Sequence, residues 1–138
     1  MEKRFLIGAL AALTISSTLS AAEFNLKENM YKLNNYMMLM QAGFIEGNKE
    51  KSLKAAEALG EESAKLLGNE EVMRKMLPSD KAHKAHKAHI ATTSAHLISD
   101  NVEIIKASKD NFRRETAQNA YLDIQRACMR CHNLVRDW

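Results

Sequence analysis

Proline, glycine and aromatic residues are scarce in this chain of 138 residues, which has one proline, five glycines and 6% aromatic residues. Runs of β-branched residues are also rare, whereas alanine, leucine, lysine, glutamate and methionine are abundant. The abundant residues favour helix, so the composition predicts helix along most of the chain. A strong excess of one charge is lacking too, because the formal net charge is +3 and the lysines are spread out. No basic stripe is interleaved with aromatic rings, which makes nucleic acid a poor candidate partner.

The N-terminal segment has the pattern of a secretory signal peptide. A basic start (Lys3, Arg4) is followed by an apolar run over 5–19 and then by small residues. This run is too short and too rich in serine and threonine for a good spanning helix, which needs about 20 apolar residues. We therefore expect residues 1–22 to be a cleaved signal peptide and residues 23–138 to form one periplasmic domain, with an uncleaved anchor as the alternative.

The spacing of apolar residues predicts four helices, over residues 26–45, 50–67, 79–106 and 112–135. The stretch "EGNK" at 46–49 separates the first two. Gly68 and Asn69 are suited to end the second helix, and a short turn of helix is expected before Pro78. Ser79 is the expected N-cap of the third helix.

Each expected helix has one apolar face, which predicts the side that it turns to the core. For the first helix this face is Leu26, Met30, Leu33, Met37, Met40 and Phe44, and for the second Leu53, Ala56, Gly60, Ser63 and Leu67. For the third it is His83, Ile90, Leu97 and Ile104, and for the fourth Ala117, Tyr121, Ile124, Cys128, Cys131 and Val135. Short connections force neighbouring helices to be antiparallel, so the predicted fold class is all-α, an antiparallel up-down-up-down four-helix bundle.

Both cysteines of the chain lie near its end, in the stretch Cys128-Met129-Arg130-Cys131-His132. They could be small core residues or a disulfide, although a bridge between residues three apart closes almost no loop. A thioredoxin-like redox pair would need a βαβ pattern around it, and the sequence has none. A zinc site would need more ligands than two cysteines and one histidine.

Covalent attachment of haem accounts for every residue of this motif. Two thiols one helical turn apart can add to the two vinyl groups on one edge of a porphyrin. Cys128, Cys131 and His132 share one helix face, which puts the histidine in position to be an axial ligand of the iron. The motif therefore predicts one covalent haem c, bound through Cys128 and Cys131, with its iron bound by His132.

A helical bundle with this motif near the end of its last helix resembles the cytochrome c-prime family. The tail "CHNLVR" is similar to the family's ending of Cys-His, two residues, an aromatic or apolar residue, and Arg. Val135 stands where an aromatic residue is commoner, and the connection before the third helix is shorter than is usual in the family. The resemblance implies that Arg136 lies close to the haem propionates. It also implies one of two functions, because some members bind small gases at an open iron site whereas others are electron carriers with a methionine ligand.

The sixth iron ligand is therefore the residue that decides function. In a bundle of this kind the haem end of the fourth helix meets the start of the first helix, where Met30 is on the inward face. Met37 is also inward, about 10 Å further along the helix. Met30 is our expected ligand, and the resemblance to methionine-ligated members favours it too. Met37 is the second choice, His83 would give a bis-histidine haem, and an open site or methionines that only fill the core are the remaining alternatives.

The repeat "KAHKAHKAH" at 81–89 is interpreted as a solvated Lys/His face, with metal binding by His83 and His86 as a weaker alternative. No catalytic group is indicated, so the chain is not expected to be an enzyme. The favoured function is a periplasmic one-electron carrier whose redox partners have acidic docking surfaces. The alternatives are a five-coordinate protein that binds NO or CO and a haem-free helical module. A stable membrane span is not expected after signal cleavage, and a homodimer is possible.

Overall fold

The computed structural model describes residues 26–77, 83–108 and 114–135, and within these ranges the chain is helical and contains no strand. The helices are α1 (Leu26–Glu46), α2 (Lys49–Leu67), α3 (Glu70–Met76), α4 (Lys84–Ala107) and α5 (Arg114–Val135). The all-α class predicted from the sequence is confirmed. Among the described residues, no helix is long and apolar enough to cross a membrane.

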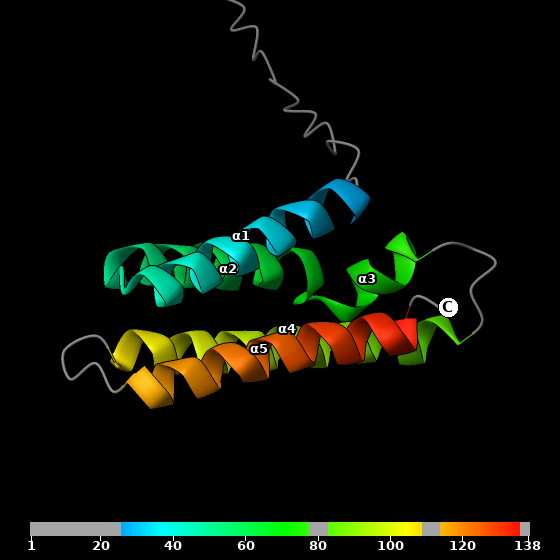
Figure 1. Ribbon diagram of the computed structural model, residues 1–138. Coiled ribbons are helices and arrows are strands. Elements are labelled where there is room, and N and C mark those ends of the chain that lie inside the picture. Colours follow the sequence, from blue (N-terminus) through cyan, green and yellow to red (C-terminus); the bar gives the residue numbers. More distant parts are fainter. Residues whose placement is uncertain (1–25, 78–82, 109–113, 136–138) are drawn as a thin grey trace, which may run out of the picture.

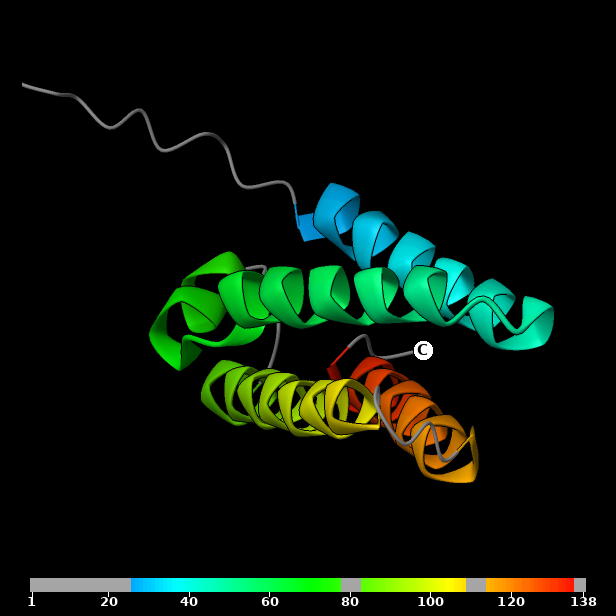
Figure 2. The ribbon, with the colours of Figure 1, turned by 90° about the vertical axis from the view of Figure 1, so that its left-hand side faces the viewer.

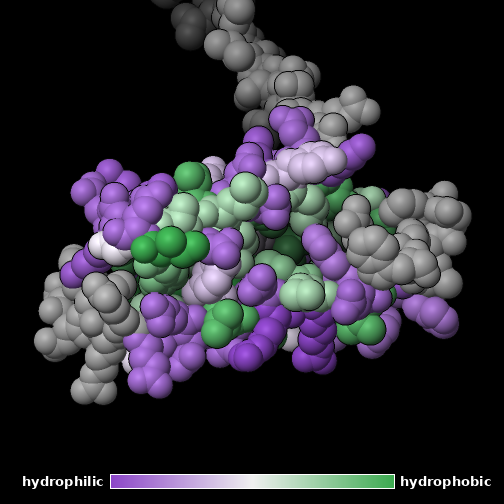
Figure 3. Space-filling model, viewed as in Figure 1, coloured by the Kyte–Doolittle hydropathy of each residue, from purple (hydrophilic) through white to green (hydrophobic). Residues whose placement is uncertain are grey.

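The long helices pack as two hairpins, α1 with α2 and α4 with α5 (Figure 1). The hairpins are joined mainly by α2 packing on α4, and the short helix α3 also packs on α4. By contrast, α1 and α5 make at most marginal backbone contact, and the turned view shows the two hairpins as two layers (Figure 2). The surface is hollowed between them, with apolar side chains inside the hollow (Figure 3).

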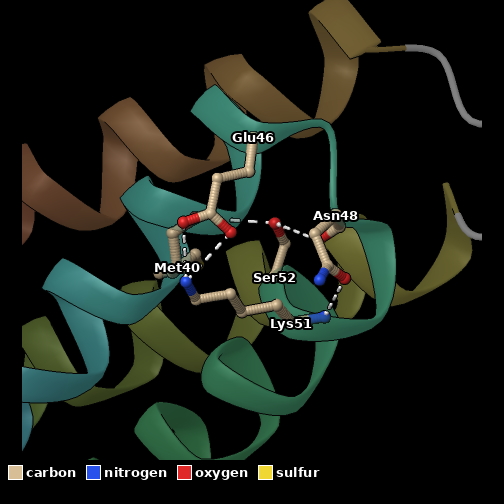
Figure 4. A network of polar contacts seen from close by, with 5 residues as sticks. All are labelled: Met40, Glu46, Asn48, Lys51 and Ser52. Carbon is tan, nitrogen blue, oxygen red and sulfur yellow. Dashed lines mark hydrogen bonds and ion pairs between the residues drawn. The ribbon is translucent and has the colours of Figure 1, made fainter.

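The turn between α1 and α2 brings the two helices very close together (Figure 4). Gly47 has a positive φ of 69°, and the Asn48 side chain accepts a hydrogen bond from the backbone N–H of Lys51 at 3.0 Å, which caps α2. The Ser52 hydroxyl donates to the carbonyl of Asn48 at 3.2 Å. A Cβ at Gly43 would lie 2.7 Å from the backbone nitrogen of Ser52, so only glycine permits this approach.

The apolar faces predicted for the first, second and fourth helices are confirmed. On α1, Leu33 and Met40 are buried and the other four residues of the predicted face are partly buried. On α5, Ala117, Ile124 and Cys131 are buried. Large residues from the two hairpins also meet across the core: the ring centroids of Phe44 and Tyr121 lie 5.7 Å apart.

The apolar face predicted for the third helix is wrong. His83 is exposed, and Leu97 and Ile104 retain 39% and 42% of their accessible surface. Half of the residues that α4 buries are small, and the face consists of Lys87, Ala88, Ala91, Ser94, Ala95, Ile98, Val102 and Ile105. Small side chains let α4 lie close to its neighbours, as at Gly60 of α2, where a Cβ would lie 3.3 Å from a methyl group of Val102. The face was misassigned because large apolar residues were taken to mark it, whereas alanines and Ser94 form half of it.

The expected start of the third helix is also wrong. The helix begins at Lys84, and His83 occupies the N-cap position with a left-handed φ of 54° and no capping hydrogen bond from its side chain. A residue with positive φ cannot continue a right-handed helix, so the helix does not extend back through His83. Ser79, the predicted cap, lies outside the described residues. The short helix expected before Pro78 is confirmed as α3, which begins after the N-cap Asn69.

The corrected face of α4 predicts different costs for truncating two adjacent isoleucines. Ile105 is fully buried, so Ile105→Ala should lower the free energy of unfolding by about 2 to 5 kcal/mol through lost burial and a residual cavity. Ile104→Ala is the matched control and should cost less than about 1 kcal/mol, because its side chain already contacts water. Urea denaturation of the purified variants measures both values. Equal costs would contradict the assigned face.

Candidate functional site

A cavity lies between the two hairpins, where the first half of α1 faces the end of α5. It is open to solvent on one side and has a volume of about 80 Å³. Its lining is largely apolar, and comes from α1, α2, α4 and α5: Met30, Leu33, Asn34, Met37, Leu67, Ser94, Ile98, Cys128, Cys131 and His132.

The α5 side of the cavity holds the predicted Cys-x-x-Cys-His motif. Because α5 is helical through Val135, Cys128, Cys131 and His132 lie on one face, and all three line the cavity. Cys131 is 5% exposed, whereas Cys128 and His132 are partly buried. The three residues therefore share one inward-facing side of α5, as their spacing predicts.

Burial controls the protonation of both cysteines. It raises the pKa of the Cys128 thiol from 9.0 to about 11, and the neighbouring Cys131 adds to this effect. Burial also raises the pKa of Cys131, although a hydrogen bond with Ser94 opposes the shift. Redox-active cysteines depend on a lowered pKa that supplies the thiolate. Neither thiol has that property, so the environment of the pair does not favour a disulfide oxidoreductase.

The α1 side of the cavity carries two of the four methionines in this helix. Met30 and Met37 both line the cavity and are partly buried, whereas Met40 is enclosed in the core and Met38 is 60% exposed. This distribution agrees with the inward and outward positions expected from helical spacing. Met30 and Met37 therefore line the same cavity as His132, and their positions alone do not identify which of them would be the iron ligand.

Two polar residues of the cavity were not foreseen. Asn34 lies between Met30 and Met37 along α1, and its amide contacts the sulfur of Met38 at 3.7 Å. Ser94 of α4 lines the opposite part, and its hydroxyl donates to the carbonyl of Ile90 at 2.9 Å. Asn34 lies four residues after Met30 and therefore on the same face of α1, so its place in the cavity could have been predicted from this spacing. Ser94 was missed because the inward face of its helix was misassigned.

The other proposed site residues do not contribute to the described cavity wall. His83 is exposed at the N-cap of α4 and is absent from the lining, so the structure does not bring it to the motif of α5. Arg136 lies outside the described residues. Of the remaining repeat histidines, His86 is exposed, and His89 contacts the carboxylate of Glu70 at 3.1 Å.

The donor atoms around the cavity are suited to an iron porphyrin. Imidazole and thioether sulfur are axial ligands of haem iron in proteins, and the apolar lining suits the porphyrin plane. Within the described ranges, no group of three or more His, Cys, Asp or Glu residues is placed to hold a metal ion. That finding does not bear on haem, because a porphyrin supplies four nitrogen ligands itself.

Comparison of the chain with protein-family models, with curated proteins and with solved structures found no match.

The raised pKa of Cys128 predicts a pH dependence of stability in the chain without haem. Above pH 9 the thiol ionises in the unfolded chain but stays protonated in the fold until about pH 11, so stability should fall as the pH rises through this window. Two pKa units correspond to a loss of up to about 3 kcal/mol. Urea denaturation between pH 8 and 11 measures the loss.

Cys128→Ala is the control for this prediction, because the lysines and Tyr121 titrate in both proteins. The free energies of unfolding of the two proteins should diverge from pH 9 upwards, with the unsubstituted chain falling more steeply. Parallel curves would show that Cys128 is not buried as the structure has it.

Proposed function

We propose that this protein is a periplasmic c-type cytochrome that carries one electron at a time on a single covalently bound haem. One observation carries the proposal: a single cavity is lined by the Cys-x-x-Cys-His motif of α5 on one side and by methionines of α1 on the other. The resemblance of the chain to the cytochrome c-prime family, based on residues 128–136, agrees with this function. The periplasmic location rests on the signal-peptide pattern of residues 1–22.

The two cysteines would hold the haem covalently. The sulfur of each thiol bonds to one carbon of a vinyl group, the vinyl double bond becomes a single bond, and the thiol hydrogen moves to the neighbouring carbon. The addition consumes no oxidant or reductant. Cys128 and Cys131 are one helical turn apart on the cavity wall, which supports attachment of both to the same edge.

His132 and a methionine of α1 would bind the iron from opposite sides. Haem, when bound, supplies an iron that changes between the ferric and ferrous states. The neutral sulfur of methionine favours the ferrous state and so raises the reduction potential. We assign this role to Met30 rather than Met37, because the start of α1 and the end of α5 lie at the same end of the assembly (Figure 1). Keeping both ligands in both states limits rearrangement during electron transfer.

The proposed fold of the complete protein is the antiparallel up-down-up-down four-helix bundle. The chain directions of the two hairpins in Figure 1 support it. The cavity between the first half of α1 and the end of α5 also supports it, because a haem there would lie between the two hairpins. Arg136 would then contact the haem propionates, as the family resemblance implies.

The surface beside the motif suits a redox partner with an acidic docking surface. Arg130 is exposed on α5, one residue from Cys131, and Met129 is 59% exposed beside it. A positive charge next to an apolar side chain can steer and then hold such a partner, with an association rate that falls as salt is added.

A five-coordinate gas-binding protein is the second candidate. Leu33, Leu67 and Ile98 give the cavity an apolar lining, which would suit NO or CO at an open iron site. A bis-histidine haem using His83 has less support, because His83 is exposed and does not line the cavity.

Optical spectra of the purified protein and of three methionine variants test the proposal. The ferric protein should show a low-spin spectrum with the weak long-wavelength band of methionine–iron ligation. Met30→Ala should convert it to a high-spin spectrum that binds CO in the ferrous state, because the sixth position is then open. Met37→Ala should keep the low-spin spectrum. Met38→Ala is the matched control, since this residue lies on the same helix but points away from the cavity, and it should leave the spectrum unchanged.

Three other outcomes would lead to different conclusions. A high-spin spectrum of the unsubstituted protein would favour the gas-binding function over electron transfer. Loss of the low-spin spectrum in Met37→Ala alone would show that the ligand is Met37, about two turns further along α1 than Met30. A protein without haem absorption, produced where c-type haem attachment operates, would contradict the proposed class.

A further inference from the structure

The histidine repeat at the start of α4 forms a surface that the haem proposal does not use. His83, His86 and His89 are all exposed, and none lines the cavity. They are not equivalent, because His83 has a left-handed backbone and precedes the helix, whereas His86 and His89 lie within it. Residues three apart on a helix are surface neighbours, about 5–6 Å apart at Cβ. His86 and His89 are therefore the pair that the backbone holds together.

A carboxylate from another helix is directed at one of these rings. The Nδ1 atom of His89 lies 3.1 Å from an Oε2 atom of Glu70, in the first turn of α3. The start of α3 is fixed by its cap, in which the Asn69 side chain accepts from the N–H of Val72 at 3.0 Å. The hydroxyl of Thr92 also donates to the carbonyl of Leu67 at 2.9 Å, which ties α4 to the chain just before α3. The fold thus holds Glu70 beside His89 although the two are far apart in sequence.

A carboxylate at Nδ1 prepares the other ring nitrogen of His89 for metal binding. When Nδ1–H donates to Glu70, the Nε2 atom carries a lone pair, and histidines that bind metals commonly have such a carboxylate partner. Of the described lysines in the repeat, Lys84 and Lys87 do not follow the line of His86 and His89 along the helix, and Lys87 is buried.

We propose that His86 and His89 bind a late first-row divalent cation such as Zn²⁺, with Glu70 as a positioning residue that orients the His89 ring. Imidazole is a preferred ligand of these ions. Two protein ligands leave the other coordination positions to water. The site is separate from the cavity, and the proposal does not depend on haem.

Calorimetric titration with Zn²⁺ alone, on the full chain after signal removal, tests the site. The protein should bind one equivalent that depends on both histidines. His86→Gln and His89→Gln should each weaken that binding by at least about tenfold, because each removes one of two ligands. His96→Gln is the matched control, an exposed histidine further along α4, and it should leave the affinity unchanged. His83→Gln should also leave it unchanged.

The positioning role of Glu70 has its own spectroscopic readout. In ¹⁵N NMR spectra, Glu70→Ala should change the tautomer populations of His89 and weaken Zn²⁺ binding by up to about tenfold. Glu71→Ala is the control, because Glu71 pairs with Lys75 at 3.0 Å, and it should change neither. Zn²⁺ binding that survives in both His86→Gln and His89→Gln, or that is lost in His83→Gln but not in His89→Gln, would overturn the proposal. So would a His89 tautomer that is unaffected by Glu70→Ala.

Discussion

The close packing of α2 on α4 is the contact on which the rest of the structure depends. It is the main junction between the two hairpins, and it is made possible by small residues such as Gly60 and Ala95. The hairpins meet along this line, and a cavity remains between the first half of α1 and the end of α5.

The Cys-x-x-Cys-His motif near the end of the sequence lies at this cavity. A Cys-x-x-Cys-His motif on an isolated helix would expose two reactive thiols, but here the motif lines a largely apolar cavity that raises the pKa of both cysteines. The opposite wall supplies methionine sulfur from α1. The proposed haem would lie between the first half of α1 and the end of α5, so that the group responsible for function would also add to the core.

Much of this could be predicted from the sequence, and each failure has a physical cause. The expected ends of α1, α2 and α5 were within two residues of those observed, because large apolar residues mark their inward faces. The face of α4 was misassigned because three alanines and Ser94 form half of it, and its start was missed because a left-handed histidine stands at the N-cap. Met30, Met37 and the motif of α5 were correctly expected to face inward, since helical spacing determines this. Ser94 was not foreseen, because its place in the cavity depends on how separate helices pack.

The central claim is that Cys128 and Cys131 hold a haem covalently, and intact-mass spectrometry of the denatured protein tests it most directly. The protein should be produced in a host that exports it and attaches c-type haem. The account predicts that the denatured chain retains the added mass of one haem, and that a variant carrying both Cys128→Ala and Cys131→Ala does not. A denatured chain with the mass of the polypeptide alone would contradict the account.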